Sequence, residues 1–222
     1  MLFREMALSG ISPPPELRDG KTLGWWDWQR GTSIDTSNYV SSWADRLNGL
    51  ALVQASAGAQ PLKGEGIVFD GTSDSIVKAG LSISQPITCY VVCNQISFNS
   101  TDAIISFNDA SIVSYYQTTT VGSTRLNATT TITNDKSVIG IKQLHTVILN
   151  TTSSSIQINN TVAVSGDIGT RTINSIILGT GYSPLLNGNI GFYDVIIRTQ
   201  LDSATLQAKI KKFLSQKNRI TL

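Results

Sequence analysis

Apolar residues in this chain fall in short runs separated by Gly, Asn, Asp, Ser and Thr, and several of the runs alternate with polar residues. Alternation with a period of two indicates a strand with one buried face. Closely spaced turn signals favour antiparallel sheets over βαβ units. The pattern predicts an all-β protein whose strands pack in two sheets. The predicted strands cover residues 24–28, 66–70, 75–78, 87–95, 103–107, 112–117, 124–133, 144–150, 155–158, 161–164, 175–178 and 191–199.

One hairpin is predicted in detail. The stretches Ile156-Gln-Ile158 and Val162-Ala-Val164 both alternate, and two asparagines lie between them. Asparagine tolerates the left-handed backbone that a two-residue turn requires. We therefore predict a hairpin with residues 159–160 as its turn.

The chain ends in a different pattern. Leu206, Ile210 and Phe213 recur at helical spacing and predict a helix over about 202–217. Asp202 is the predicted N-cap, and Leu201 and Leu206 are the predicted hydrophobic staple. Lysines at 209, 211, 212 and 217 give this helix a basic face. We expect that face to be solvated, with a membrane or an acidic partner as the alternative.

The first 22 residues differ from the rest of the chain. Pro13, Pro14 and Pro15 favour an extended polyproline conformation, which is incompatible with a central strand. We therefore divide the chain into an extended N-terminal arm, residues 1–22, and one β-sandwich, residues 23–222, that ends in the helix. One domain of this size agrees with all-β sandwiches, which often run to about 200–250 residues.

Composition limits the classes of partner. Charged residues make up 14% of the chain, against about 25% in an average soluble protein, and the net charge is +2. Outside the last helix no basic stripe is present, so we expect no nucleic-acid partner. No apolar run approaches the about 18 residues of a membrane span, so we expect no membrane insertion. Cys89 and Cys93 lie about 13 Å apart along one predicted strand, too far for a disulfide, and we expect both on one buried face.

Three stretches stand out from this pattern: Trp43-Ala-Asp45-Arg-Leu-Asn48-Gly49, Phe69-Asp70-Gly71-Thr-Ser-Asp74, and Gly188-Asn-Ile-Gly-Phe-Tyr-Asp194-Val-Ile-Ile197. Asp, Asn and Gly in the first two suit turns, because the polar side chains satisfy backbone donors and glycine accepts positive φ. In this order the stretches resemble the landmarks of concanavalin A-like lectin/glucanase domains. The resemblance is closest to the laminin-G-like group found in bacterial surface proteins and in bacteriophage virion and tail proteins.

The resemblance covers residues 25 to 216 approximately and implies an antiparallel two-sheet jelly-roll sandwich. It implies that Trp43 packs inside the sandwich and that Asp45 and Asn48 bend the following loop. Asp194 stands where the family has glutamate, so we transfer no role to it.

Catalysis is not expected. Glucanases of this family carry their carboxylates on one strand in a Glu-x-Asp-x-x-Glu-like run, and glycan hydrolysis needs two carboxylates across the scissile bond. The three glutamates of this chain, at 5, 16 and 65, form no such run. His145 is the sole histidine and has no nucleophile motif beside it. We therefore expect that the protein is not an enzyme.

Binding is the expected activity. Aromatic rings with amides nearby commonly hold sugars. The predicted carbohydrate-binding residues are Tyr115 and Tyr116 with Asn108 and Asp109, together with Trp26, which we expect to be exposed.

Calcium is a second candidate ligand. Related domains hold calcium with loop carboxylates, which makes Asp70 and Asp74 the candidate metal ligands. Two aspartates supply few of the six to eight oxygens that calcium takes. No other cofactor is expected.

The resemblance implies a non-enzymatic bacteriophage virion protein of the tail or capsid surface, whose lectin-like domain attaches to host glycans or serves as a virion scaffold. The expected partners are other virion proteins, reached through the arm, host cell-surface glycans, and further copies of this chain in a homo-oligomer. The expected location is the virion surface, after assembly in the host cytoplasm. Two alternatives stay open: a free carbohydrate-binding lectin, with or without calcium, and a glycan hydrolase.

Overall fold

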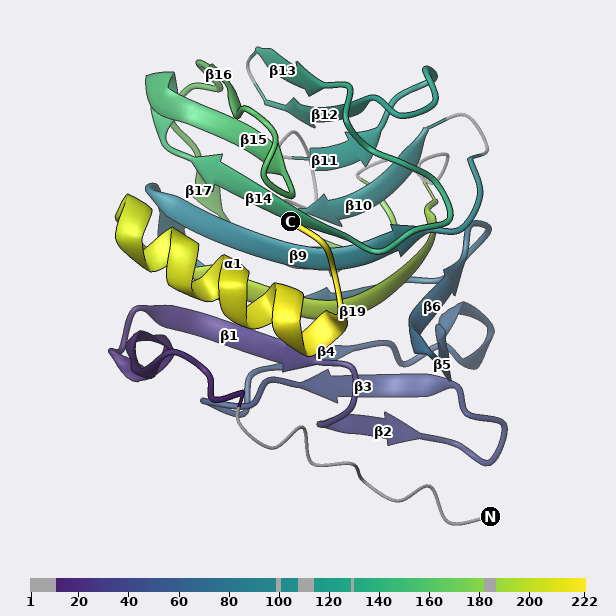
Figure 1. The fold of residues 1–222 in the computed structure, drawn as a ribbon. Helices are drawn as coiled ribbons and strands as arrows, with labels where there is room; N and C mark the ends of the chain where they lie inside the picture. The colour runs from purple at the N-terminus through teal and green to yellow at the C-terminus, as the bar shows by residue number, and fades with distance from the viewer. Residues whose placement is uncertain (1–10, 99–100, 108–113, 129, 182–186) are drawn as a thin grey trace.

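The computed structural model describes residues 11–98, 101–107, 114–128, 130–181 and 187–222, which form two layers of strands and one helix (Figure 1). Every strand pair among the described residues is antiparallel. The predicted all-β antiparallel sandwich with a C-terminal helix is therefore confirmed.

The first sheet, which we call the helix-side sheet, is built around two long strands, β9 and β19. Asn189 to Phe192 of β19 pair with β6, and Asp194 to Arg198 pair with β1, so two strands share one side of β19. Across the sheet the strands are β16 (Val164–Gly166), β15 (Ser154–Ile158), β14 (Gln143–Leu149), β9 (Ile87–Gln95), β19 (Asn189–Arg198), β6 (Gly66–Asp70) and β5 (Leu62–Gly64), with β1 (Thr22–Asp27) beside β19.

The second sheet, which we call the far sheet, lies behind the first in Figure 1. Across it the strands are β13 (Thr131–Asn134), β12 (Thr124–Asn127), β11 (Ser114–Gln117), β10 (Asp102–Ser106), β18 (Ile176–Leu178), β7 (Ile76–Lys78), β4 (Ala51–Val53), β3 (Val40–Ala44) and β2 (Thr32–Ile34). A small pair joins β8 (Ile83–Ser84) to β17 (Thr172–Ile173), and short 3-10 turns cover Pro15–Arg18, Ala57–Ala59 and Thr151–Ser153.

Alternation along β9 builds two hydrophobic cores. Cys89, Val91 and Cys93 belong to the core between the sheets, and Tyr90 and Val92 belong to a second core under the helix. Side chains of a strand point alternately to its two faces, so one strand serves both cores. The two cysteines are free and buried on one face, as predicted.

A β-bulge in β19 redirects its side chains. The register with β9 shifts between Phe192 and Asp194. Phe192 and Val195 face the core between the sheets, so the extra residue leaves both Tyr193 and Asp194 on the helix side. The bulge thereby places the Asp194 carboxylate under the helix.

The terminal helix α1 (Ala204–Asn218) lies across β9 and β19 of the helix-side sheet (Figure 1). Its N-cap is Ser203, whose side chain accepts a hydrogen bond from the Leu206 amide at 3.3 Å. The predicted cap at Asp202 is wrong, because that carboxylate is buried against Arg198 and Tyr90. Leu201 is 48% exposed, so the predicted staple is also wrong. Among the described residues, no helix is both long and apolar enough to cross a bilayer.

Two strand predictions need correction. Residues 124–133 were predicted as one strand, but they form the hairpin β12–β13 with a turn between the strands. In the predicted 156–164 hairpin, Ile156 pairs with Val164, so the loop is longer than two residues. Val162 lies in this loop and not in a strand, and its side chain is 87% exposed. Asn159 does adopt a positive φ of 50°.

Candidate functional site

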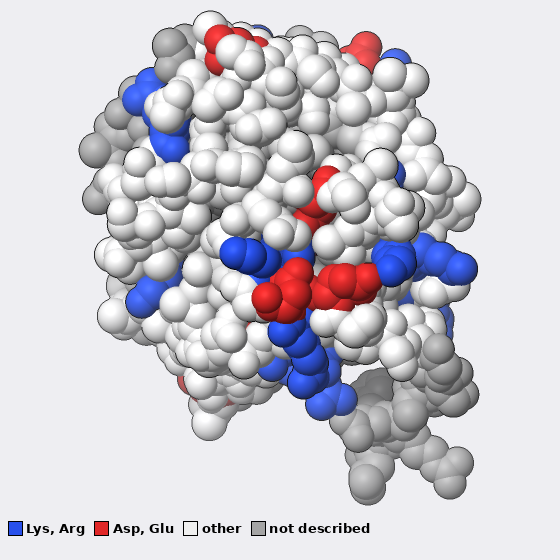
Figure 2. Space-filling model, turned by 90° about the vertical axis from the view of Figure 1, so that its left-hand side faces the viewer, with Lys and Arg blue, Asp and Glu red and all other residues white. Residues whose placement is uncertain are grey.

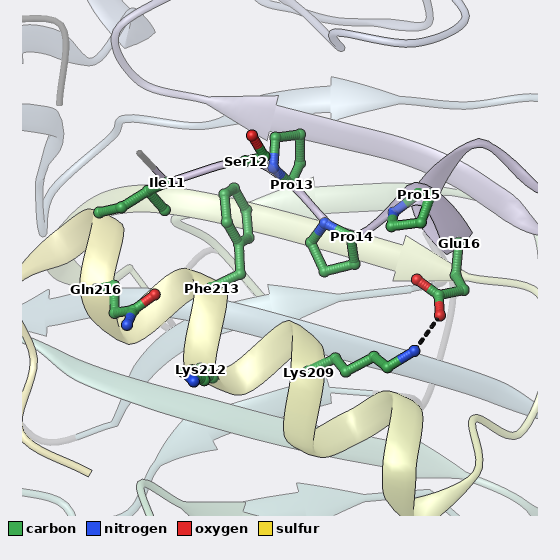
Figure 3. Close-up of a pocket in the computed structure, with 10 residues that line it drawn as sticks. All are labelled: Ile11, Ser12, Pro13, Pro14, Pro15, Glu16, Lys209, Lys212, Phe213 and Gln216. Atoms are coloured by element: carbon green, nitrogen blue, oxygen red, sulfur yellow. Dashed lines mark hydrogen bonds and ion pairs between the residues drawn. The ribbon is translucent and has the colours of Figure 1, made fainter. Parts of the chain in front are cut away.

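The described part of the N-terminal arm lies along α1 and leaves a groove between them (Figure 3). Leu17 anchors the arm, being 1% exposed and part of the core under the helix. Glu16 pairs with Lys209 of α1 at 2.6 Å. Residues 11–16 therefore form one wall of a concave site, and α1 forms the other.

Arg198 at the end of β19 holds the arm in place. Its Nη2 donates to Asp19 at 2.7 Å, its Nη1 donates to the Glu16 carbonyl at 2.9 Å, and its Nε donates to Asp202 at 2.8 Å. Burial opposes the charge, but the hydrogen bonds and charges of Asp19 and Asp202 outweigh it and raise the pKa of Arg198. One fully buried cation thus joins the arm, β19 and the segment that leads into α1.

The groove has a volume of about 350 Å³, within the usual range of small-ligand sites. Its floor is apolar: Phe213 is 6% exposed and packs edge-on against Trp25, with ring centroids 5.4 Å apart. Lys209, Lys212 and Gln216 come from one side of α1, because positions three and four apart share a helix face. The lining residues are Ile11, Ser12, Pro13, Pro14, Pro15, Glu16, Lys209, Lys212, Phe213 and Gln216.

The charges of the groove are unevenly matched. The hydrogen bond from Lys209 lowers the pKa of Glu16, so this carboxylate is ionised at neutral pH. Lys212 is exposed and forms no ion pair with a described residue. Seen from the left-hand side of Figure 1, a mixed group of acidic and basic side chains lies near the centre of a largely uncharged face, and other charged side chains are scattered around it (Figure 2). The groove therefore combines apolar surface, an amide, an internal ion pair and one further cation.

Of the predicted metal ligands, Asp70 ends β6 and Asp74 lies in the β6–β7 loop. One Asp70 oxygen accepts from the amides of Thr72, Ser73 and Asp74 at 2.8, 3.0 and 3.3 Å, and Asp74 accepts from the Asp70 amide at 3.0 Å. These bonds close the turn that the sequence predicted. Among the described residues no group of three or more His, Cys, Asp or Glu is placed to hold a metal ion. Calcium binding stays an untested expectation.

The two carboxyls of this loop have unlike pKa values. Burial, together with the charge of Asp70, raises the pKa of Asp74 to about 6. Burial opposes the ionisation of Asp70 as well, but the amides of Ser73 and Thr72 more than compensate and lower its pKa. Asp74 therefore titrates close to neutral pH, while Asp70 stays ionised.

Replacement of Asp74 by Asn should stabilise the protein at neutral pH. The pKa is about 6 in the folded state against 3.8 ordinarily, so folding disfavours the charged form. The neutral carboxyl makes its full contribution to the free energy of unfolding below pH 3.8. That contribution is lost as the pH rises through about 6. The amide stays neutral and still accepts from the Asp70 amide. We expect the melting temperature of Asp74→Asn, measured by calorimetry, to exceed that of wild type by about 2–4 °C at neutral pH but not at acidic pH.

The exposed control Asp135→Asn should leave the melting temperature unchanged at both pH values. An unaltered melting temperature in Asp74→Asn at neutral pH would refute the expectation.

The predicted carbohydrate-binding residues are not brought together as one site. Trp26 is 0% exposed in the core between the sheets, so the expectation that it is exposed is wrong. Its indole donates to the Leu50 carbonyl at 3.2 Å instead. Tyr115 is also fully buried, whereas Tyr116 on the opposite face is half-buried. Asn108 and Asp109 lie outside the described residues.

His145 lies in the core between the sheets and is 1% exposed. The Tyr115 hydroxyl lies 2.6 Å from its Nδ1, and burial lowers the pKa of His145 to about 3. A neutral, enclosed imidazole of this kind packs as part of the core.

A pair of opposed carboxylates lies beneath α1. Asp27 and Asp194 are register partners on β1 and β19, and Lys217 donates to them at 2.9 and 2.6 Å. Burial raises the pKa of Asp194, and the charge of Lys217 opposes that rise. Paired carboxylates are the groups that glycan hydrolysis uses. Both are at most 1% exposed here, so the pair clamps the helix to the sheet and offers no surface to a substrate.

The groove was not found from the sequence. The signals were present: three prolines precede Leu17, and Lys209, Lys212 and Gln216 share one helix face. The sequence did not indicate that the arm and the helix are in contact, because 193 positions separate Glu16 from Lys209. Local pattern does not report a pairing at that separation.

Comparison with known proteins shows similarity of fold. No family model and no curated protein matches the sequence. Trypanosoma rangeli sialidase matches 91% of this chain with 34% of its own, at a TM-score of 0.66 and 12% identity. A GH54 α-L-arabinofuranosidase matches 79% of this chain with 50% of its own, at 0.58 and 11%. The binding domain of Paraclostridial Mosquitocidal Protein 1 matches 91% with 53%, at 0.58 and 13%.

The chain thus spans a third to about half of the structures that it resembles, and at such low identity the likeness shows the fold alone. Two expectations are corrected by these neighbours. Sialidase and arabinofuranosidase are glycoside hydrolases, so this fold occurs in enzymes. The prediction that the protein is not an enzyme is therefore wrong, because it excluded catalysis. The predicted phage attachment function is also wrong, because the structures that share this fold are a sialidase, an arabinofuranosidase and a toxin binding domain, and none of these three is a phage protein.

Proposed function

We propose that this chain is the glycan-holding β-sandwich of a glycan-active protein, and that the glycan lies in the groove between the arm and α1. The observation that supports this most is the groove, which joins an apolar floor to polar side chains on both walls. Sugar rings have an apolar C–H face and a rim of hydroxyls, so they match such a lining. The fold shared with sialidase and arabinofuranosidase supports the same class of ligand.

We also propose that the β-sandwich has the architecture of the laminin-G-like group. Trp43 is 0% exposed in the core between the sheets, where that resemblance implies it to be. Asp45 accepts from the amides of Leu47, Asn48 and Leu50, and so bends the loop after Trp43. These contacts support a common architecture with that group.

Filling the groove should abolish binding. Ser12 is exposed and lines the groove, so Ser12→Trp places a large ring in the space of a ligand without disturbing the core. We expect at least about a tenfold weaker affinity for the best glycan of a panel, measured by calorimetric titration. Thr36→Trp is the matched control, because Thr36 is exposed on the β2–β3 turn and does not line the groove.

Each outcome bears on the proposal. Loss of binding in Ser12→Trp with wild-type affinity in Thr36→Trp would support the groove as the site. Equal binding in both variants would place the glycan elsewhere on the protein. A wild-type chain that neither binds a glycan of the panel nor releases reducing ends from it would refute the proposed function.

A further inference from the structure

The groove has a charge that nothing in the described structure balances. Lys209 is already paired with Glu16 at 2.6 Å. Lys212 lies one turn further along α1, lines the same space and forms no ion pair with any described residue. The positive charge of the groove is therefore concentrated on one side chain.

Neighbouring groups favour an anion beside Lys212. Gln216 follows it by four positions on the same helix face, so its amide donors are available next to the ammonium group. The opposite wall, residues 11–16, includes Pro13 and Pro14, which carry no charge and offer apolar C–H surface (Figure 3). The one carboxylate of the lining belongs to Glu16, and Lys209 neutralises it.

We propose that the groove takes a glycan with a carboxylated sugar, whose carboxylate binds Lys212 while its ring packs on the proline wall. This inference rests on the proposed function and names its substrate class. The groove is open, so the ion pair is partly solvated, and its contribution is moderate and reduced by salt.

The test compares sialyllactose with lactose, which differ by one carboxylated sugar. For wild type we expect about threefold to tenfold tighter binding of sialyllactose in calorimetric titration. Lys212→Gln should remove that preference. Raising the salt to about 0.5 M should reduce the preference as well. Lys136→Gln is the matched control, because Lys136 is an exposed lysine that pairs with Asp135 outside the groove.

Several results would overturn this inference while leaving the proposed function intact. They are equal affinity for the two sugars, an unchanged preference in Lys212→Gln, and tighter binding of sulfated lactose than of sialyllactose. Absence of binding to every sugar, with or without charge, would refute the proposed function itself.

Discussion

Replacement of Arg198 by Met should lower the free energy of unfolding by about 3–5 kcal/mol, the range for breaking a buried ion pair on one side. Arg198 is 0% exposed and donates to Asp202 and Asp19. Asp202 is 2% exposed, so loss of the guanidinium leaves a carboxylate buried without its cation. The methionine side chain replaces the apolar stem but none of the hydrogen bonds. Urea denaturation followed by circular dichroism measures the change.

Arg30→Met is the control for this experiment. Arg30 is exposed and forms no salt bridge with a described residue, so its replacement should stay within about 0.5 kcal/mol of wild type. Adding Asp202→Asn to Arg198→Met should restore part of the loss, because it removes the unpaired charge. A loss below about 1 kcal/mol in Arg198→Met would contradict the role of Arg198 as the joint of arm, β19 and helix.

Replacement of Trp26 by Ala should cost about 3–5 kcal/mol as well, the usual range for truncating a fully buried aromatic side chain. Trp26 is 0% exposed, and it packs with Trp43 and Leu52 in the core between the sheets. Its removal leaves a cavity and also leaves the Leu50 carbonyl without the indole hydrogen bond. The change is measured by the same urea titration.

Trp28→Ala provides the comparison, since Trp28 is only half-buried at the end of the same tryptophan run. We expect it to be clearly less destabilising than Trp26→Ala. If Trp26→Ala folded as stably as wild type and lost glycan affinity instead, the side chain would be a surface contact, and the structure would be wrong at this position.

Much of the fold was readable from local pattern. The strands at 66–70 and 87–95 were predicted with the bounds that β6 and β9 have, because each is a mainly apolar stretch with turn residues beyond its ends. The strands β2, β3, β4, β5, β8 and β17 were missed. They have between two and five residues, so their pairing depends on neighbours rather than on their own sequence.

The candidate site was less predictable than the fold. The turn at Asp70 and Asp74 was found, because a side chain that bonds amides two to four positions away is a local event. The groove was missed, because its walls come from opposite ends of the chain. Trp26 was misplaced for a related reason. Alternation assigns it to a face of β1, but only the layers that cover β1 decide whether that face meets water.

The sequence by itself determined the all-β class, the strand faces of β9, the terminal helix and the aspartate turns, since each depends on interactions between residues close in the chain. Tertiary structure alone decided the sharing of β19 by β6 and β1, the burial of Arg198 and the groove between arm and helix. These features join residues that lie far apart in the chain: Asn189 of β19 pairs with Asp70 of β6, and Lys209 pairs with Glu16. Periodicity reports which face of an element is apolar, and it contains no information on which distant element comes to cover that face.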